Sequence, residues 1–428
     1  MKYPRRLLLV IFASACAFVR GQEEERHAPP IEIPDFSNLD EYIYEPKSTV
    51  RFGFRNLSGA KVQFSGGGLI PSPRDPGAAT GANLQHFYHD GAVLTNSRTT
   101  PRKDSEGNPM LDPQSGTQIY DPIAPDGRTN NWAYADDRQI QSPYAPNGYI
   151  AFHSYSAEVT DAAIRSGQSR STAGIDLSVS RDLGKFLGTR ISWALVGGLS
   201  LNDLSGKKTD RVLANMTTIT DLYSLYGQVP PAAPYTAPST TSQAVYDASG
   251  NPLYNADGSM QVVTVDNSVL IGDQPASRTT DVTPTSLATD ATKGIVTNNW
   301  KLKGAFYTFR VGPEFWIPIS TRFRAIVSFG PAVLYSGTTY TLTETFIPDF
   351  GPEVTQTDHS IVNRLTPGYF ADASLQFDLT EKAGFFAGAV YQSAASFTQT
   401  INTENTHAAT KVDFSNMSGI RAGMSIRF

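Results

Sequence analysis

The chain ends on the stretch GIRAGMSIRF, residues 419–428, and this stretch decides the fold. Its apolar side chains stand at every second position: Ile420, Ala422, Met424, Ile426 and Phe428. The positions between them carry glycine, serine or arginine. A period of two places the two kinds of side chain on opposite faces of a β-strand. A strand that is apolar on one face, polar on the other and aromatic at its end is what a transmembrane β-barrel requires.

The same alternation recurs along the chain, at residues 48–65, 173–180, 191–202, 304–315, 322–346, 369–378 and 385–391. Together with the closing stretch, these segments predict an all-β protein: a transmembrane antiparallel up-and-down β-barrel of eight strands over residues 48–428. We expect 48–65 to be one long strand rather than a hairpin turning at 56–59, because its parity survives the polar middle. Ten to twelve strands are the alternative. They require that the weak strand-like pieces at 131–140 and 149–158 also count and that the first segment is split.

The connections between the predicted strands alternate in length. Those near 184–188, 318–321 and 380–382 are short, whereas 66–170, 206–298, 347–364 and 402–410 are long or polar. In outer-membrane barrels the short turns are periplasmic and the long loops extracellular. Both chain ends are therefore expected in the periplasm. The insertions 66–170 and 206–298 are expected outside the cell and dispensable for the barrel, and the second opens with a candidate amphipathic helix over 213–226.

The first residues have the anatomy of a signal peptide. Lys2, Arg5 and Arg6 precede a short apolar run that is too short to span a bilayer. Residues 1–21 are expected to be removed. The alternative reading makes Cys16, the one cysteine of the chain, a lipidated N-terminus. Residues 22–47 are rich in proline and glutamate and are expected to form an extended periplasmic segment.

Composition agrees with these expectations. The net charge of −5 gives no case for nucleic-acid binding. Charged residues make up 18% and aromatic residues 11%, and 35 glycines fit close-packed strands. With one cysteine, the chain can form no internal disulfide, so its stability must come from elsewhere. A closed, hydrogen-bonded barrel is one such source.

The closing strand and the N-terminal signal together resemble the bacterial outer-membrane β-barrel superfamily, whose last strand carries a C-terminal aromatic residue as its assembly signal. The resemblance implies that the row from Ile420 to Phe428 is read by the barrel-assembly machinery. It also implies localisation in the bacterial outer membrane, in contact with its lipid and lipopolysaccharide. By strand pattern, the chain is similar to the small OmpA/OmpX-like barrels.

Charged side chains occupy the predicted lumen-facing parity of several strands. The candidates are Asp176, Arg310, Glu314, Arg322, Arg324, Asp372, Asp378 and Arg421, with Arg51 and Arg55 as further candidates. They could line a charged channel or a proton path. An eight-stranded barrel, however, is only wide enough for its own side chains, and buried charges need partners of opposite sign. We therefore expect an interlocking ion-pair network that fills the lumen.

Other candidate chemistry is weaker. His86 and His89 are three residues apart without a supporting third ligand, so no metal site is predicted and no cofactor is expected. Asp136-Asp137 and Asp358-His359 resemble the Asp pair and the Asp-His pair of the omptin proteases. The members of each pair are adjacent here and would diverge on a strand, whereas that family spaces them on one face. The chain is accordingly expected not to be an enzyme.

These observations favour an outer-membrane barrel with a structural or surface-interaction role, whose extracellular partner the sequence does not name. A porin-like channel for small solutes is the alternative, and an outer-membrane enzyme is the third hypothesis.

Overall fold

The computed structural model describes residues 47–428, apart from 82–83, 116, 170, 245–250 and 256. The chain divides into two units, Met1–Glu45 and Pro46–Phe428, and the account below concerns the second. The expected signal peptide, Cys16 and all but the last residue of the expected periplasmic segment lie outside the described residues. Within the described ranges, no helix has the length and apolar character needed to cross a membrane.

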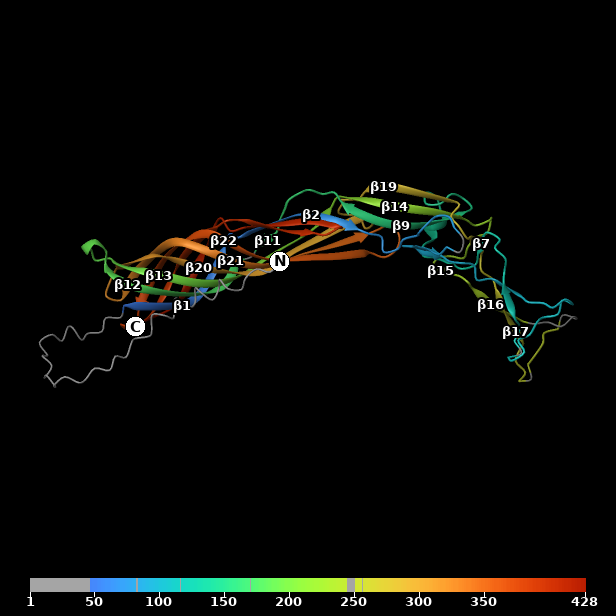
Figure 1. The fold of residues 1–428 in the computed structure, drawn as a ribbon, viewed down its shortest axis with the longest axis horizontal. Helices are drawn as coiled ribbons and strands as arrows, with labels where there is room; N and C mark the ends of the chain where they lie inside the picture. Colours follow the sequence, from blue (N-terminus) through green and yellow to red (C-terminus); the bar gives the residue numbers. More distant parts are fainter. Residues whose placement is uncertain (1–46, 82–83, 116, 170, 245–250, 256) are drawn as a thin grey trace, which may run out of the picture. The chain divides into compact units, whose positions relative to one another are not determined.

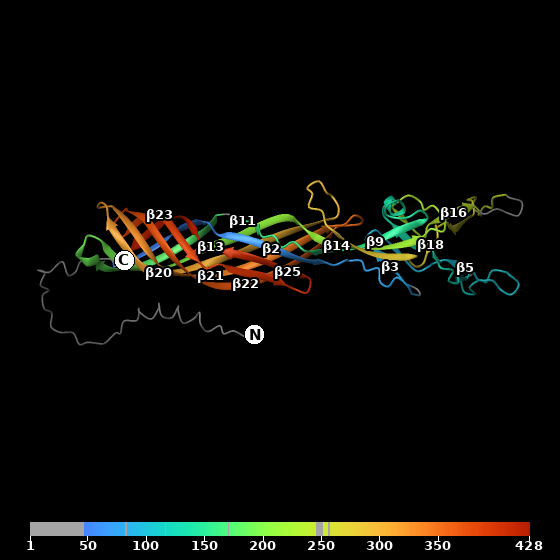
Figure 2. The ribbon, with the colours of Figure 1, turned by 90° about the horizontal axis from the view of Figure 1, so that it is seen from above.

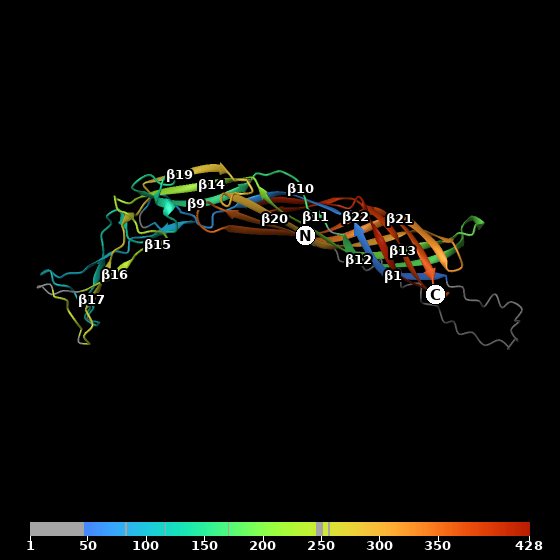
Figure 3. The same ribbon diagram turned by 180° about the vertical axis from the view of Figure 1, so that it is seen from behind.

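The all-β prediction is confirmed, since the described helices are two short 3-10 turns, η2 (Asp137–Ile140) and η3 (Phe186–Gly188). Eight strands form the principal antiparallel sheet: β1 (Ser48–Ser58), β12 (Thr172–Lys185), β13 (Ser192–Val212), β20 (Ile295–Pro318), β21 (Phe323–Ile347), β22 (Val354–Asp378), β23 (Ala383–Ala394) and β26 (Met417–Arg427). Their order is β13-β12-β1-β26-β23-β22-β21-β20, and β20 pairs again with β13. The sheet therefore closes on itself, with the C-terminus beside β1 (Figures 1 and 3). We call it the closed sheet.

The two ends of the closed sheet's chain meet at one backbone pair. Strand β1 pairs antiparallel with β26 from Thr49 opposite Arg427 to Ser58 opposite Ser418. Beyond that ladder, Ser48 and Phe428 exchange both of their backbone hydrogen bonds at 3.0 Å. The last residue of the chain is thus fixed in the sheet rather than frayed.

After β1 ends at Ser58, the chain continues into β2 (Lys61–Ile70), which belongs to a second sheet. It contains β2, β9 (Tyr149–Val159), β14 (Ala214–Ser224), β19 (Ser277–Pro284), β24 (Phe397–Asn402) and β25 (Thr406–Asp413), in the order β19-β14-β9-β2-β25-β24. The prediction of one strand over 48–65 is therefore wrong. The break is at Gly59, whose φ is +100°. An added Cβ there would lie 2.1 Å from the Asn416 carbonyl oxygen, so glycine is required where these two segments approach each other.

The two long insertions pair with each other. Strands β9 and β14 run side by side along their full lengths (Figure 2). Short pairings join β8 (Trp132–Tyr134) to β15 (Tyr235–Thr236) and β7 (Arg128–Thr129) to β18 (Ile271–Gly272). Strands β3 (His86–Tyr88) and β4 (Gly91–Val93) complete the β8–β15 sheet. We call residues 71–159 and 214–284 the loop module.

The remaining short strands are local. The hairpins β5 (Thr99–Pro101) with β6 (Tyr120–Pro122) and β16 (Thr240–Ala244) with β17 (Val262–Asp266) each belong to one insertion. Strand β10 (Arg165–Ser166) pairs with β2, and β11 (Gln168–Ser169) pairs with β13.

Several predicted loops are strands. The expected helix over 213–226 is wrong, because β14 occupies this segment and pairs with both β9 and β19. Three of its residues, Thr217, Thr218 and Thr220, are β-branched and favour a strand. The expected loop 347–364 shrinks to 348–353 between β21 and β22. The expected loop 402–410 shrinks to 403–405 between β24 and β25.

Candidate functional site

The half of the closed sheet that carries the short turns has a charged interior. Arg310 on β20 donates two hydrogen bonds to Asp176 on β12, at 2.7 and 3.0 Å. Arg421 on β26 donates to Asp372 on β22 at 2.9 Å. The pairs also face each other, with Arg310 3.7 Å from Asp372 and Arg421 3.6 Å from Asp176. All four side chains are 6% exposed or less, so they form one buried cluster.

A second buried pair joins β1 to β20. Arg51 donates to both oxygens of Glu314, at 2.8 and 2.9 Å. Arg55 on the same face of β1 bonds Ser200 at 2.8 Å and also bonds Gln392, which in turn donates to Thr308 at 2.9 Å. Gln392 was not among the expected residues. Gln392 follows Tyr391, which belongs to the outward apolar row, so the alternation along the strand could have predicted that Gln392 faces inward.

A third, partly exposed group lies near the short turns. Asp378 accepts from Arg324 and from Arg427, each at 2.5 Å. Arg322 does not join it, and its placement in the lumen is corrected: the residue is exposed in the turn between β20 and β21. The alternation was extended one residue too far, since β21 begins at Phe323.

These contacts pair the buried charges of the interior with one another. Each buried charge in the cluster faces an opposite charge from another strand, which is how a low-dielectric interior tolerates ions. Removing one partner would leave an uncompensated buried charge, at a cost of about 3–5 kcal/mol. The network therefore fixes the relative register of β1, β12, β20, β22 and β26.

The polarity of the closed sheet inverts along its strands. On the short-turn part of β20, the inward side chains are Thr308, Arg310 and Glu314, whereas Tyr307, Phe309 and Val311 point outward and are 40–49% exposed. Farther along the same strand the arrangement reverses. Trp300, Leu302 and Phe306 are buried inside, and Lys301 and Lys303 are exposed outside.

Strand β21 shows the same change on its outer face. Its outward residues change from Val327, Phe329 and Tyr335 to Thr339, Thr341, Thr343 and Thr345. Its inward row is mixed in both parts, with Ile326 and Ser328 near the short turns and Leu342, Glu344 and Phe346 beyond. Strand β13 changes outward from Leu195 to Asp203 and Lys207. The outer face of these strands thus changes, partway along their length, from apolar to polar.

Aromatic side chains mark both limits of the outward apolar band. At the inversion, the ring centroids of Tyr307 and Tyr335 lie 6.5 Å apart, and those of Tyr369 and Tyr391 lie 6.1 Å apart. Near the short turns, Phe323 and Phe377 lie 5.0 Å apart. The band on β20 runs from Tyr307 to Ile317, about 33 Å along a strand. At a tilt of roughly 40°, this gives a height of about 25 Å.

The residues expected to form the assembly signal lie on the outer face of β26. Ile420, Met424, Ile426 and Phe428 are large exposed apolar side chains, and Ala422 is exposed between them. Their role as a signal stays a prediction.

The loop module holds a buried histidine–carboxylate pair. His153 Nδ1 lies 2.6 Å from Asp90 Oδ2, and the His153 backbone N–H donates to the other Asp90 oxygen at 2.8 Å. Burial raises the pKa of Asp90. The imidazole stacks on Phe350 at 4.8 Å. With side-chain exposures of 5% and 1%, His153 and Asp90 join β9 to the β3–β4 hairpin.

A second polar contact ties the two insertions together. The Tyr88 hydroxyl donates to Asp221 at 2.5 Å and lies 2.8 Å from the Tyr223 hydroxyl. Arg278 donates two hydrogen bonds to Asp221, at 2.7 and 2.6 Å, and these raise the pKa of Arg278. Burial raises the pKa of Tyr88 well above its usual range. Asp221 therefore accepts hydrogen bonds from both segments of the loop module.

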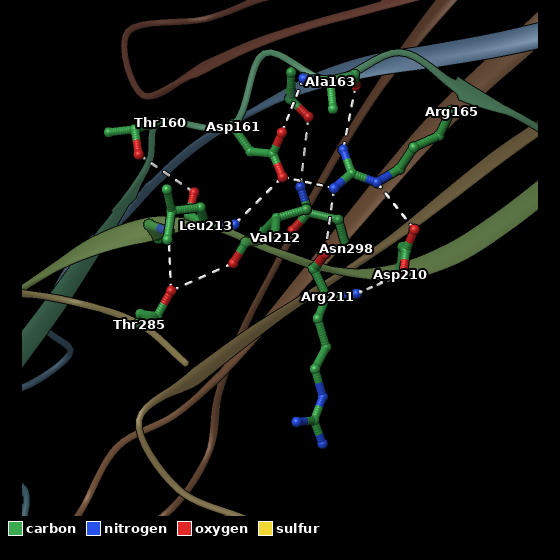
Figure 4. A network of polar contacts seen from close by, with 12 residues as sticks. Thr160, Asp161, Ala163, Arg165, Asp210, Arg211, Val212, Leu213, Thr285 and Asn298 are labelled. Carbon is green, nitrogen blue, oxygen red and sulfur yellow. Dashed lines mark hydrogen bonds and ion pairs between the residues drawn. The ribbon is translucent and has the colours of Figure 1, made fainter. Parts of the chain in front are cut away.

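Figure 4 shows the polar network where the chain passes from β13 to β14. Arg165 donates to Asp161 at 2.6 Å and to Asp210 at 3.1 Å, and its guanidinium lies 5.3 Å from the Trp300 ring centroid. The Thr285 hydroxyl oxygen accepts a hydrogen bond from the Ala214 backbone N–H at 2.9 Å. The network fastens the β13–β14 transition to the segment between β9 and β10.

The motif residues outside these clusters do not converge. Asp136 caps η2 and pairs with Arg138 at 2.6 Å. Asp358 accepts a hydrogen bond from Gln356, while the adjacent His359 is exposed on the other face of β22. Over the described ranges, no three His, Cys, Asp or Glu side chains are grouped so that they could hold a metal ion.

The chain matches no protein-family model and no curated protein. Among solved structures, it is similar to the outer membrane protease OmpT from Escherichia coli, at 9% identity and a TM-score of 0.30, over 89% of this chain and 97% of that one. It is also similar to a Pseudomonas aeruginosa FadL homologue (8% identity, TM-score 0.17, 89% and 90% covered) and to the P. putida toluene transporter TodX (6%, 0.17, 90% and 91%).

These likenesses agree with the expected localisation in the bacterial outer membrane, and they lend no support to the finer resemblance to OmpA/OmpX-like small barrels. One similar structure is a protease, which contradicts the expectation that the chain is not an enzyme, and that expectation is withdrawn. At TM-scores this low, the likenesses assign no activity to this chain.

Proposed function

We propose that this chain is a bacterial outer-membrane β-barrel with a filled lumen, which carries the loop module outside the membrane for contact with partners at the cell surface. The polarity inversion along β20 and β21 is the observation that carries the proposal. A soluble sheet needs its apolar face inside throughout. Only a strand that leaves lipid for water partway along its length needs an outer face that is apolar in one part and polar in the next.

The dimensions of the band agree with this assignment. Its height of about 25 Å is that of the outward apolar band of outer-membrane barrels, and girdles of aromatic residues flank such bands at both interfaces. The closed pairing of the eight strands leaves no free sheet edge in the apolar zone, which a bilayer requires.

The interior favours an anchor over a porin-like channel. The cluster of Arg310, Asp176, Arg421 and Asp372 and the Arg51–Glu314 pair are buried side chains of several strands that meet across the lumen. A porin with an aqueous channel is built from 16–18 strands, about twice the number in the closed sheet.

Conductance distinguishes the two functions. The purified, folded chain would be added to a planar lipid bilayer in 1 M potassium chloride (roughly seven times physiological ionic strength), with a trimeric porin as the positive control. We expect no stable conductance steps. Reproducible steps from folded protein would contradict the filled lumen and favour the porin-like alternative.

Orientation is tested on intact cells. Single cysteines at the exposed positions Ser105, in the first insertion, and Glu381, in a short turn, would be treated with a membrane-impermeant maleimide. We expect Ser105→Cys to react on intact cells and Glu381→Cys to react only after the outer membrane is permeabilised. The reverse pattern would contradict a loop module at the cell surface.

A further inference from the structure

The loop module and the β21–β22 loop enclose a cavity of about 340 Å³, a volume in the range of small-molecule sites. It is lined by Pro73, Arg74, Phe87, Tyr88, His89, Gly91, Ala92 and Pro352. These residues come from three places: the segment after β2, the β3–β4 hairpin, and the loop between β21 and β22.

The wall that carries Pro352 is held in a fixed position. Phe350 is buried, stacks on the His153 ring at 4.8 Å and meets the Tyr144 ring edge-on at 4.7 Å. Gly351 has a φ of +81°, and an added Cβ would lie 2.3 Å from the His89 carbonyl oxygen. The loop therefore packs tightly against the hairpin, and the cavity is formed before any ligand arrives.

The lining is largely apolar. Phe87 presents a partly exposed ring, and Pro73, Pro352 and Ala92 add aliphatic surface. The Tyr88 hydroxyl is already engaged with Asp221 and Tyr223. An aromatic or aliphatic ligand body thus meets matching walls.

The polar groups at the cavity are donors. Arg74 has no carboxylate partner within the described ranges. His89, 7% exposed, uses Nδ1 to accept the Tyr155 backbone N–H at 3.1 Å, so the neutral ring carries its proton on Nε2. Nε2 is buried without a partner. Burial, and then the charge of Arg74, lower the pKa of His89 to about 4, which keeps the ring neutral at pH 7.

We propose that this cavity binds a small aromatic monocarboxylate, with its ring against Phe87 and the two prolines and its carboxylate at Arg74 and His89. An arginine beside an apolar surface is an arrangement that proteins use for carboxylates, because the charge-assisted bonds give both strength and orientation. The site lies between the loop module and the β21–β22 loop, and it does not depend on the membrane assignment.

Isothermal titration of the full chain in lipid nanodiscs tests the site, with 3-phenylpropanoate as the probe, 3-phenylpropan-1-ol as its neutral counterpart and empty nanodiscs as the blank. We expect the carboxylate to bind about tenfold or more tightly than the alcohol, the difference that one charge-assisted hydrogen bond provides. Arg74→Gln should remove that difference. Phe87→Ala should weaken both ligands.

Arg102→Gln is the matched control, because Arg102 is an exposed arginine of the β5–β6 hairpin outside the cavity. It should leave both affinities unchanged. Folding of each variant would be verified by heat-modifiable mobility on gels. Absence of saturable binding, equal affinity for acid and alcohol, or equal losses in Arg74→Gln and Arg102→Gln would overturn the proposal.

Discussion

An arginine placed at two heights on the outer face of β21 tests the proposed membrane band most directly. The outward apolar row of this strand runs from Phe323 to Tyr335 and is centred on Phe329. Val327 lies two residues from that centre, about 7 Å along the strand. At a tilt of roughly 40°, this is about 5 Å from the bilayer midplane. The control position, Thr343, lies eight residues beyond Tyr335, roughly 20 Å above the band.

The expected costs differ widely. A lipid-facing arginine costs about 2–4 kcal/mol at the midplane and about 0–1 kcal/mol at the interface. Val327→Arg should therefore lose about 2 kcal/mol, roughly a 30-fold drop in the ratio of folded to unfolded protein. Thr343 pairs with the uncharged Asn299 and Thr357. Thr343→Arg should change stability by about 0.5 kcal/mol or less, as surface substitutions do.

Reversible urea unfolding in phospholipid vesicles, followed by tryptophan fluorescence, measures both variants against the wild type. The comparison is valid if the slope of unfolding free energy against urea stays constant, so that the midpoint alone moves. Equal losses at the two positions, or a neutral Val327→Arg, would refute the assignment of the band to lipid.

Three further outcomes are expected. Arg310→Met should cost about 3–5 kcal/mol in urea unfolding because it leaves buried carboxylates unpaired, and adding Asp176→Leu should recover part of the loss; additive losses would contradict the cluster. His89 has a folded pKa of about 4 against 6.5 in the unfolded chain, so its contribution is complete above pH 6.5 and is lost as pH falls toward 4. Wild type should therefore lose more protection of loop-module amides from hydrogen exchange between pH 7.5 and 4.5 than His89→Asn does, and identical losses would exclude this role. Phe428→Asp should block assembly, and a heat-modifiable barrel in the outer membranes of cells expressing it would contradict the signal.

The short-turn half of the closed sheet could be predicted from the sequence because a single rule governs it. An apolar outer row and a polar inner row make residues 304–315 alternate sharply, and Arg310 and Glu314 could be assigned to the interior from parity alone. Which carboxylate each arginine meets could not be predicted, since this depends on register across strands. Arg322 was misassigned because a turn and a strand differ there by one residue.

Beyond the inversion, the sequence signal weakens for a physical reason. On β22 between Val354 and Asn363, both faces are intermediate or exposed, so no apolar row exists to reveal the strand. On β14, Met216, Ile219, Leu222 and Tyr223 happen to repeat at helical spacing, but pairing with β9 and β19 decides the structure. The bend at Gly59 depends on its contact with Asn416, which local sequence does not contain.

The joint construction of the loop module has a consequence for the order of folding. Trp132 of the first insertion donates to the Val269 carbonyl oxygen of the second at 2.8 Å, and Tyr88 shares Asp221 with Arg278. Between the two insertions, the chain forms the β12–β13 hairpin. The aromatic interior of the module therefore cannot close until both insertions, which flank that hairpin, have reached the same compartment. A stalled chain would display two unmatched half-cores, which are ready substrates for proteases.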